Sequence, residues 1–333
     1  MTATGLPFPG LRSGVELVPT TDQPQTGKDF TSDQEVRWCP GCGDYAVLKA
    51  VQGFLPDLGL RRENIVFVSG IGCSSRFPYY LDTYGMHSIH GRAPSIATGI
   101  ATAREDLSVW VVTGDGDALS IGGNHLIHAL RRNVNMTILL FNNRIYGLTK
   151  GQYSPTSEAG KITKSTPMGS LDHPFNPVSL ALGAEATFVA RTIDSDRKHL
   201  TTVLSAAAAH RGTSLVEIYQ NCPIFNDGAF DTLKGADATE QLLRLEPGVQ
   251  VTAHGHTWAH DPTEPDPTWQ FALSRLDTDP HTPTPIGIFR QVERPTYDDQ
   301  ARAQLATARQ AAPGEPTDRL AALIGSGDTW MVN

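Results

Sequence analysis

The chain has 333 residues, 39% of them hydrophobic and 19% charged, which is enough to bury the core of one large domain or of two ordinary ones. With 35 acidic residues against 27 basic ones, the formal net charge is -8. That balance argues against nucleic acid or an anionic membrane as a partner, because either would favour a basic surface. The apolar runs have the length of strands, well short of the roughly 20 residues that a spanning helix needs. No pattern typical of a secretory signal is found at the start, and four cysteines are too few for a disulfide scaffold.

The composition divides the chain into three parts. Residues 1–35 are rich in Thr, Pro, Gly and Asp without sustained periodicity, and we interpret them as an N-terminal arm. Residues 36–228 alternate short apolar runs with longer amphipathic ones, as expected of one domain. Residues 229–333 are rich in proline, with a helix predicted at 297–311. We interpret this last part as a C-terminal extension that packs on the core or on a partner subunit.

Within residues 36–228, four apolar runs are predicted to be buried strands and four amphipathic runs to be helices. The strands are expected at 64–69, 108–113, 136–141 and 214–219, and the helices at 45–54, 94–104, 122–132 and 196–210. This alternation predicts an α/β fold, a doubly wound and mostly parallel sheet with helices on both faces. Ligands of such sheets bind at the carboxyl ends of the strands. The irregular stretch 147–177 is long enough to be a lid or a binding loop.

One motif follows two neighbouring predicted strands. Gly114-Asp115-Gly116 comes directly after one strand, and Asn142-Asn143 ends the next. A carboxylate and an amide oxygen at adjacent strand ends suit Mg²⁺, which takes few oxygen ligands from protein and the rest from phosphates and water. Glycines allow close approach of a diphosphate, and the helix start beyond them offers free N–H groups. Separately, a tight Gly-Asp-Gly turn and an Asn-Asn C-cap would explain the two pieces.

With this spacing, the pair resembles the diphosphate-binding motif of thiamine diphosphate enzymes. The resemblance implies that the side chains of Asp115 and Asn143 and the carbonyl group of Ile145 bind Mg²⁺. It implies an α/β domain of the thiamine diphosphate-binding fold at 36–228. The cofactor contacts expected on this basis come from Gly72, Ser74, His90, Gly114, Asp115, Gly116, Asp117, Asn143, Tyr146, Gly147 and Leu148.

The four cysteines match the number of ligands of one metal site. Cys39 and Cys42 have the CxxC spacing that lets two thiolates bind one metal from a tight turn, while Cys73 and Cys222 each follow a predicted strand. Four thiolates suit a structural Zn²⁺ or an iron–sulfur cluster, and spacing does not choose between them. A CxxC redox pair with two bystanders, or ordinary small core residues, would also explain the pattern.

Five motifs then occur in one order: Cys-Pro-Gly-Cys-Gly at 39–43, Gly-Ile-Gly-Cys-Ser at 70–74, His-Gly-Arg-Ala-Pro at 90–94, Gly-Asp-Gly-Asp at 114–117 and Tyr-Gly-Leu-Thr-Lys-Gly-Gln at 146–152. From about residue 38 to 226 the chain closely resembles the β subunit of 2-oxoacid:ferredoxin oxidoreductases, most nearly the 2-oxoglutarate type. The resemblance implies a 4Fe–4S cluster on Cys39, Cys42, Cys73 and Cys222. It also implies an oxidoreductase that converts 2-oxoglutarate and coenzyme A reversibly to succinyl-coenzyme A and CO₂.

In that reaction thiamine diphosphate supplies the carbon nucleophile and the electron sink, and the cluster passes electrons singly to ferredoxin. His90 and Arg92 are candidates for contacts with cofactor or substrate, although a buried hydrogen-bonded histidine and a surface arginine would also explain them. Lys150 is expected to reach the distal carboxylate of the substrate, with Leu148 shaping the pocket beside it. A solvated surface position is the alternative for Lys150.

The carboxylate that thiamine enzymes need beside the aminopyrimidine ring is not identifiable in this sequence. We therefore expect it on a larger α subunit, in an αβ unit that doubles to α₂β₂. Four reduced cysteines on one cluster indicate a cytoplasmic protein. Pyruvate or a broad range of 2-oxoacids is an alternative substrate class. A non-redox thiamine enzyme with a Zn(Cys)₄ site and a phosphate-holding regulatory subunit are the alternative kinds of protein.

Overall fold

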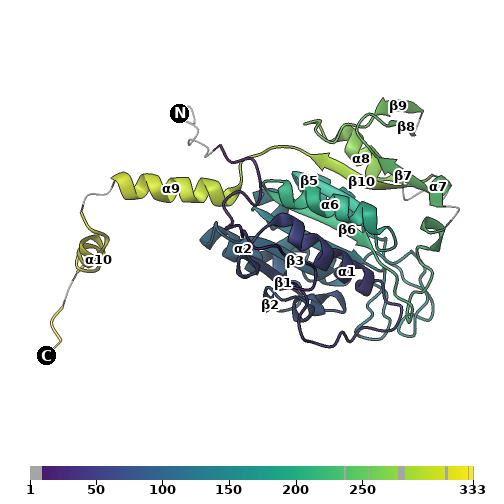
Figure 1. Ribbon diagram of the computed structural model, residues 1–333, viewed down its shortest axis with the longest axis horizontal. Helices are drawn as coiled ribbons and strands as arrows, with labels where there is room; N and C mark the ends of the chain where they lie inside the picture. Colours follow the sequence, from purple (N-terminus) through teal and green to yellow (C-terminus); the bar gives the residue numbers. More distant parts are fainter. Residues whose placement is uncertain are drawn as a thin grey trace.

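A computed structural model describes residues 10–235, 238–253, 255–276, 282–311, 314–328 and 330–332. Its centre is an eight-stranded sheet with the strand order β2-β1-β3-β4-β6-β5-β10-β7, and β8 and β9 form a separate hairpin (Figure 1). The strands are β1 Ile65–Ser69, β2 Tyr84–His87, β3 Ser108–Gly114, β4 Met136–Asn142, β5 Phe188–Ile193, β6 Thr213–Tyr219, β7 Leu242–Leu245, β8 Gln250–Ala253, β9 His256–Ala259 and β10 Thr284–Gln291.

Helices alternate with these strands along the chain. The α-helices are α1 Asp44–Phe54, α2 Ala93–Ala103, α3 Asp115–Leu119, α4 Gly123–Arg132, α5 Pro177–Gly183, α6 Arg197–Ala209, α7 Ala238–Gln241, α8 Thr268–Ser274, α9 Tyr297–Ala311 and α10 Pro316–Ile324. Four 3₁₀ helices join them: η1 Leu55–Leu58, η2 Arg62–Asn64, η3 Ser74–Tyr80 and η4 Asp231–Leu233. Among the described helices, none is both long and apolar enough to cross a lipid bilayer.

The sheet is parallel from β2 through β5, which confirms the predicted α/β fold. β10 runs antiparallel to β5 and parallel to β7. Because the parallel strands all point the same way, the loops after β1, β3, β4 and β6 meet at one edge of the sheet. This carboxyl edge carries every motif that the sequence singled out.

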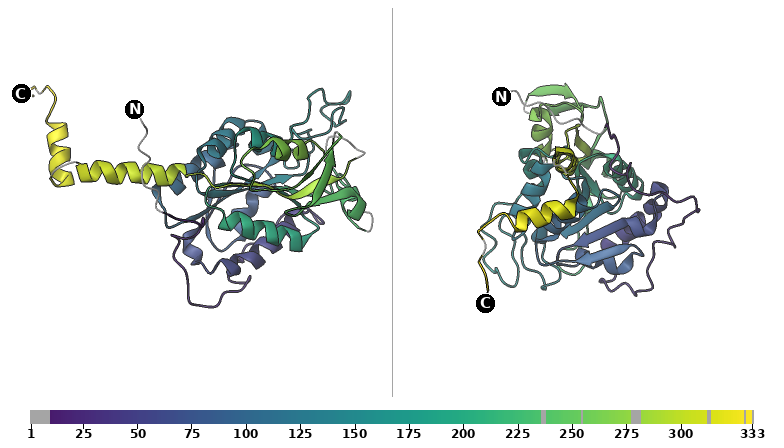
Figure 2. Two further views of the ribbon diagram at one scale, coloured as in Figure 1. Left: turned by 90° about the horizontal axis from the view of Figure 1, so that it is seen from above. Right: turned by 90° about the vertical axis from the view of Figure 1, so that its left-hand side faces the viewer.

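Helices cover both faces of the sheet (Figure 2). One face packs against α1 and α6 through residues such as Val51 and Leu204, and the other packs against α2, α4, α5 and α8. On α2 the buried positions Ala93, Ala97 and Ala101 recur every four residues, which brings one narrow face of the helix against the strands. The two apolar cores hold the strand ends rigidly in place beneath the loops.

Three departures from the sequence expectation have clear physical reasons. The helix predicted at 122–132 is α4, and a further short helix that was not predicted, α3, precedes it and begins directly at Asp115. β5 was not predicted, because the buried charge of Arg191, which pairs with Glu217 on β6, interrupts its apolar run. β10 was not predicted either, since its flanking prolines favour a loop. The helix expected at 297–311 is α9.

The two ends of the chain behave differently. Residues 10–35 lie along the α1 side, where Val18 and Phe30 are buried in the core. From 229 onward the chain first adds β7 and β10 to the sheet edge and then leaves the body as α9 and α10, which project away from it (Figure 1). The C-terminal part therefore contributes both to the sheet and to a protruding arm.

Candidate functional site

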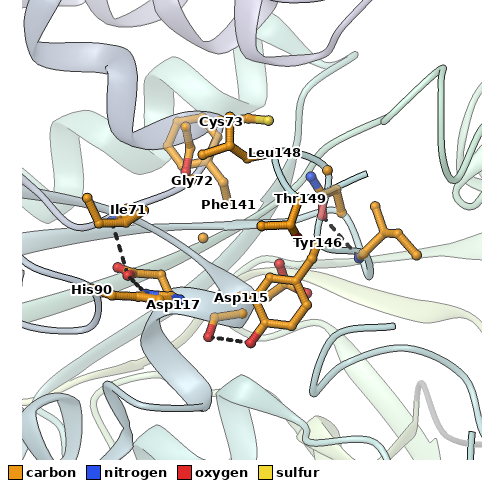
Figure 3. Close-up of a pocket in the computed structure, with 16 residues that line it drawn as sticks. Ile71, Gly72, Cys73, His90, Asp115, Asp117, Phe141, Tyr146, Leu148 and Thr149 are labelled. Atoms are coloured by element: carbon orange, nitrogen blue, oxygen red, sulfur yellow. Dashed lines mark hydrogen bonds and ion pairs between the residues drawn. The ribbon is translucent and has the colours of Figure 1, made fainter. Parts of the chain in front are cut away.

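An open cleft lies at the carboxyl edge of the sheet, between the loops that follow β1, β2, β3 and β4 (Figure 3). It is lined by Ile71, Gly72, Cys73, Ser74, His90, Gly114, Asp115, Gly116, Asp117, Phe141, Asn143, Ile145, Tyr146, Gly147, Leu148 and Thr149. All eleven predicted cofactor contacts are in this lining, together with the three predicted Mg²⁺ ligands. The structure thus brings together residues from four separate segments of the chain.

Asp115 stands at the junction of β3 and α3, with its carboxylate buried. Ser154 Oγ and Thr156 Oγ1 both donate hydrogen bonds to its Oδ2 atom, at 2.5 and 2.6 Å. Burial raises the pKa of Asp115 to about 6, and the two hydroxyl groups oppose that rise by bonding to the ionised form. A buried carboxylate at the start of a helix fits a divalent cation that bridges to a diphosphate.

From Asn142, the last residue of β4, the residues face alternately into the protein and toward the cleft. The amide of Asn142 points into the protein, where its Nδ2 donates to Glu217 Oε1 at 2.7 Å. Asn143 and Ile145 line the cleft, and Asn143 Oδ1 accepts a hydrogen bond from Ile145 N at 3.1 Å. Between them Arg144 has a left-handed backbone with φ 56°. Asn143 and Ile145 therefore line the same cleft as Asp115, and their binding of Mg²⁺ stays a prediction.

Gly116 is required by a protein contact. A Cβ atom there would lie 2.2 Å from Cε1 of Tyr146, whose hydroxyl group donates to the carbonyl oxygen of Gly116 at 3.0 Å. The glycine therefore lets the ring of Tyr146 close over the start of α3. Gly72, by contrast, has φ 141° and open space where a Cβ would be, so it leaves room in the cleft itself.

Asp117 ties three loops together. Its Oδ1 accepts hydrogen bonds from the backbone N–H groups of Ile71 and Gly91 at 3.1 and 2.7 Å and lies against Nδ1 of His90, while Thr113 Oγ1 donates to its Oδ2 at 2.7 Å. In Figure 3 the side chain of Asp117 turns toward Ile71 and His90. The carboxylate is thus occupied by protein donors, and His90 is held against the wall of the cleft.

The cysteines approach the cleft from the adjoining side. A Cβ atom on Gly147 would lie 3.4 Å from Sγ of Cys73 and 3.7 Å from Sγ of Cys222, so both sulfurs lie close to Gly147. Cys39 and Cys42 are joined by a turn in which Cys42 N donates to Cys39 O at 3.0 Å. Gly147 directly follows Tyr146, so one short segment contacts both the helix start at Gly116 and the thiols.

The thiols influence one another electrostatically. Burial, together with the nearby Asp44, Cys222 and Cys39, raises the pKa of Cys73 to about 12. The pKa of Cys42 is raised by burial and then by Asp44, Cys222 and Cys73. In the described part of the chain, no three His, Cys, Asp or Glu side chains lie close enough to hold a single metal ion. The argument that the cysteines suit a metal or a cluster therefore rests on the kind of donor. Four neighbouring thiols suit zinc and an iron–sulfur cluster alike.

Two predicted residues lie outside the lining of the cleft. Arg92 is exposed at the start of α2. Lys150 is also exposed. It lies in a tight turn, where its backbone N–H donates to Gly147 O at 3.1 Å and its φ is 83°. A non-glycine residue with that backbone is strained, and the turn holds Lys150 beside the cleft rather than in it. Their roles toward substrate stay predictions.

Three residues around Asp115 were missed by the sequence analysis. Ser154 and Thr156 belong to the irregular loop 147–176, and Asn142 was seen only as the first half of Asn-Asn. The length of the loop was the one available signal, because it marked the segment as a binding loop without saying which side chains bind.

Comparisons with known proteins agree with this geometry. Residues 70–218 match the family model described as the C-terminal TPP-binding domain of thiamine pyrophosphate enzymes. The chain is 66% identical over 340 residues to the 2-oxoglutarate oxidoreductase subunit KorB of Mycobacterium tuberculosis, covering 95% of this chain and 91% of that protein. It is 39% identical over 269 residues to the 2-oxoacid:ferredoxin oxidoreductase subunit beta of Saccharolobus solfataricus, covering 80% and 85%.

A solved structure extends the likeness to the whole fold. It is a 2-oxoglutarate:ferredoxin oxidoreductase from Magnetococcus marinus with 2-oxoglutarate, coenzyme A and succinyl-CoA bound. Its matched chain is 34% identical, with a TM-score of 0.77 over 92% of this chain and 99% of that one. The fold and the site define a thiamine diphosphate enzyme domain. The chain belongs to the β subunits of the 2-oxoacid:ferredoxin oxidoreductases, of the 2-oxoglutarate type, which confirms the resemblance read from the five motifs.

Proposed function

We propose that this chain, with a larger α subunit, converts 2-oxoglutarate and coenzyme A to succinyl-coenzyme A and CO₂. The two electrons released go one at a time to two oxidised ferredoxins, with release of one proton, and the reaction is reversible. The observation that carries the proposal is the segment Tyr146–Gly147. Its first residue packs on the Gly-Asp-Gly loop, and its second lies beside the sulfurs of Cys73 and Cys222. A diphosphate-binding loop and a set of thiols therefore share one short segment.

Thiamine diphosphate, when bound, supplies the carbon nucleophile and the electron sink of the decarboxylation. On this chain Asp115, Asn143 and the carbonyl group of Ile145 would hold the Mg²⁺ ion. Tyr146 closes over the start of α3, and Leu148, which is partly exposed, forms the outer wall of the cleft. His90 stays fixed against Asp117 and presents the rest of its ring to the cleft.

Cys39, Cys42, Cys73 and Cys222 would hold a 4Fe–4S cluster. Burial raises the pKa values of Cys42, Cys73 and Cys222 and keeps these thiols protonated in the absence of iron, so cluster binding must release protons. A 4Fe–4S cluster accepts one electron at a time, which explains why four thiols would lie beside a diphosphate-binding loop. A structural zinc ion would accept no electrons. No disulfide joins these cysteines, which is consistent with a reducing cytoplasm.

The partner subunit would complete the site. The carboxylate for the aminopyrimidine ring comes, in this proposal, from an α subunit, in an αβ unit that doubles to α₂β₂. The relatives named as β subunits support the existence of such a partner. The cleft opens outward beside exposed apolar residues such as Ile89 and Ile121, which is where an apolar partner surface would dock.

Substrate choice is assigned to the rim of the cleft. Lys150 would pair with the distal carboxylate of 2-oxoglutarate, and Arg92 and His90 would contact the substrate or the cofactor nearer the reacting carbon. Because pyruvate has no distal carboxylate, the proposed role of Lys150 separates the two substrates.

The test is anaerobic purification of the αβ complex, followed by iron analysis and viologen reduction with 2-oxoglutarate or pyruvate. The proposal expects a brown protein with about four irons per β chain, as four cysteine ligands imply, and a preference for 2-oxoglutarate. A colourless protein with one zinc per chain would support the non-redox thiamine enzyme instead. Unchanged turnover in Asp115→Ala would support the phosphate-holding regulatory subunit.

A further inference from the structure

The geometry points to Ser154 and Thr156 as positioning residues for the metal ligand Asp115. We propose that their hydroxyl groups clamp one carboxylate oxygen, so that Asp115 is held in the orientation in which it binds the divalent cation of the cofactor. The inference rests on the proposed function in one respect, the assignment of Asp115 as a cation ligand.

Both hydroxyl groups converge on a single atom. Ser154 Oγ lies 2.5 Å and Thr156 Oγ1 2.6 Å from Asp115 Oδ2, and all three side chains are buried. Hydrogen bonds to an ionised carboxylate are short and about twice as strong as neutral ones. Two such bonds to one oxygen fix the rotation of the carboxylate as well as its position. Removing either one leaves a buried carboxylate oxygen with weaker support.

The loop that carries the two hydroxyl groups is itself anchored beside β4. Ser157 Oγ accepts from Ser154 N at 2.8 Å and donates to the carbonyl oxygen of Arg144 at 2.6 Å. Ser157 N also donates to Ser154 O at 3.0 Å, which closes a turn. At the other side of the turn, Phe175 N donates to Pro155 O at 2.8 Å. The turn 154–157 is therefore held rigidly against the residues that line the cleft.

A second line of contacts orients Thr156 from the protein interior. Arg191 and Glu217 form a fully buried pair that leaves Glu217 Oε1 in contact with Asn142 Nδ2. With its nitrogen held there, the side-chain amide of Asn142 turns its oxygen toward Thr156, and the two oxygens, Asn142 Oδ1 and Thr156 Oγ1, are 2.9 Å apart. The single hydroxyl proton of Thr156 can go to only one acceptor, and the ionised carboxylate is the stronger one. The buried ion pair thus fixes the first Asn of Asn-Asn, which in turn confines Thr156 beside Asp115.

The test measures cofactor binding in the assembled αβ complex without any 2-oxoacid. Mg²⁺ is titrated at a fixed concentration of thiamine diphosphate, and binding is followed by near-ultraviolet circular dichroism. Thr156→Val and Ser154→Ala each remove one charge-assisted bond, so the half-saturating Mg²⁺ concentration is expected to rise about tenfold in each. Thr156→Ser keeps the hydroxyl group and should restore the wild-type value.

The control is Thr166→Val, which removes a hydroxyl group of the same loop that bonds only to Thr163. Melting of the cofactor-free complexes checks that each variant folds. An unchanged Mg²⁺ titration in Thr156→Val and Ser154→Ala overturns the inference, as does an equal shift in Thr166→Val. If Asp115→Asn also binds cofactor normally, the assignment of Asp115 fails. If only Asp115→Asn loses binding, the clamp alone fails.

Discussion

The carboxyl and amino edges of the central sheet both contain buried polar side chains and a hollow, but the motif residues line the hollow at the carboxyl edge. At the carboxyl edge the polar groups line a cleft formed by four segments of the chain. At the amino edge Asn133, Thr187 and His210 satisfy one another. Thr187 Oγ1 donates to Asn133 Oδ1 at 2.6 Å and lies 2.8 Å from His210 Nε2. Buried polarity alone therefore does not mark a functional site.

The amino edge uses its polar groups to attach the C-terminal arm. Arg211 forms two hydrogen bonds with the carboxylate of Asp299 at the start of α9, at 2.9 and 2.6 Å, and both side chains are buried. Asn135 N donates to Asp298 Oδ1 at 3.0 Å. Asn133 Nδ2 donates to the carbonyl oxygen of Arg294 at 2.8 Å. These contacts predict that amino-edge variants change stability and leave chemistry intact.

The largest effect is expected from loss of one thiol at the carboxyl edge. Cys73→Ser should remove the iron–sulfur absorption and reduce ferredoxin-dependent turnover at least about a hundredfold, because a 4Fe–4S cluster needs all four ligands. Visible spectra and iron content of the anaerobic complex measure this. His210→Gln at the amino edge is the control and should keep its iron. Retention of four irons by Cys73→Ser would contradict the assignment of the cysteines.

Next in size is the effect of Lys150 on substrate choice. Lys150→Met is expected to raise the KM for 2-oxoglutarate by about tenfold or more, because a hydrogen bond between charged groups is lost. The KM for pyruvate should hardly change, since pyruvate lacks the distal carboxylate. Steady-state viologen reduction with both substrates measures the difference, with Lys164→Met, exposed in the same loop, as the control. Equal changes for both substrates would refute the role of Lys150.

At the amino edge, Asp299→Ala should lower the free energy of unfolding by about 3 kcal/mol, because it leaves the charge of Arg211 buried without its partner. The turnover of the folded complex should be unchanged. Urea unfolding of the isolated chain and assays of the complex check the two halves of this prediction. Asp318→Ala, in the exposed α10, is the matched control. A loss of turnover at wild-type stability would mean that this edge is coupled to catalysis.

The smallest effect concerns pH. Burial lowers the pKa of His210 from its ordinary value near 6.5 to about 4, so the folded chain holds the neutral ring. Between these values the unfolded chain binds a proton that the folded chain does not, and stability falls as the pH is lowered. From pH 7 to pH 5 the loss is about 2 kcal/mol. His210→Gln should lack this part of the acid sensitivity in urea unfolding, while His173→Gln, which is exposed, should retain it.

The sequence alone was sufficient to predict the features that depend on neighbouring residues or on the order of motifs along the chain. Because β1, β3, β4 and β6 are short and buried, each of them is an apolar run in the sequence. The motifs lie at the ends of these runs. The four cysteines and Asp115 were found because the five motifs occur in one order. A parallel sheet then places all of them at one edge, since its strands end on the same side.

Only the tertiary structure decided which side chains support that edge. The hydroxyl groups of Ser154 and Thr156 reach Asp115 across 39 and 41 positions of sequence, from a loop without periodicity. The ion pair between Arg191 and Glu217 likewise joins two strands. It neutralises the buried charge of Arg191, which interrupts the apolar run of β5 in the sequence. Such contacts leave no local pattern, because hydrogen bonds and ion pairs between distant segments are specified by the packing that brings the segments together, not by the residues next to each partner in the chain.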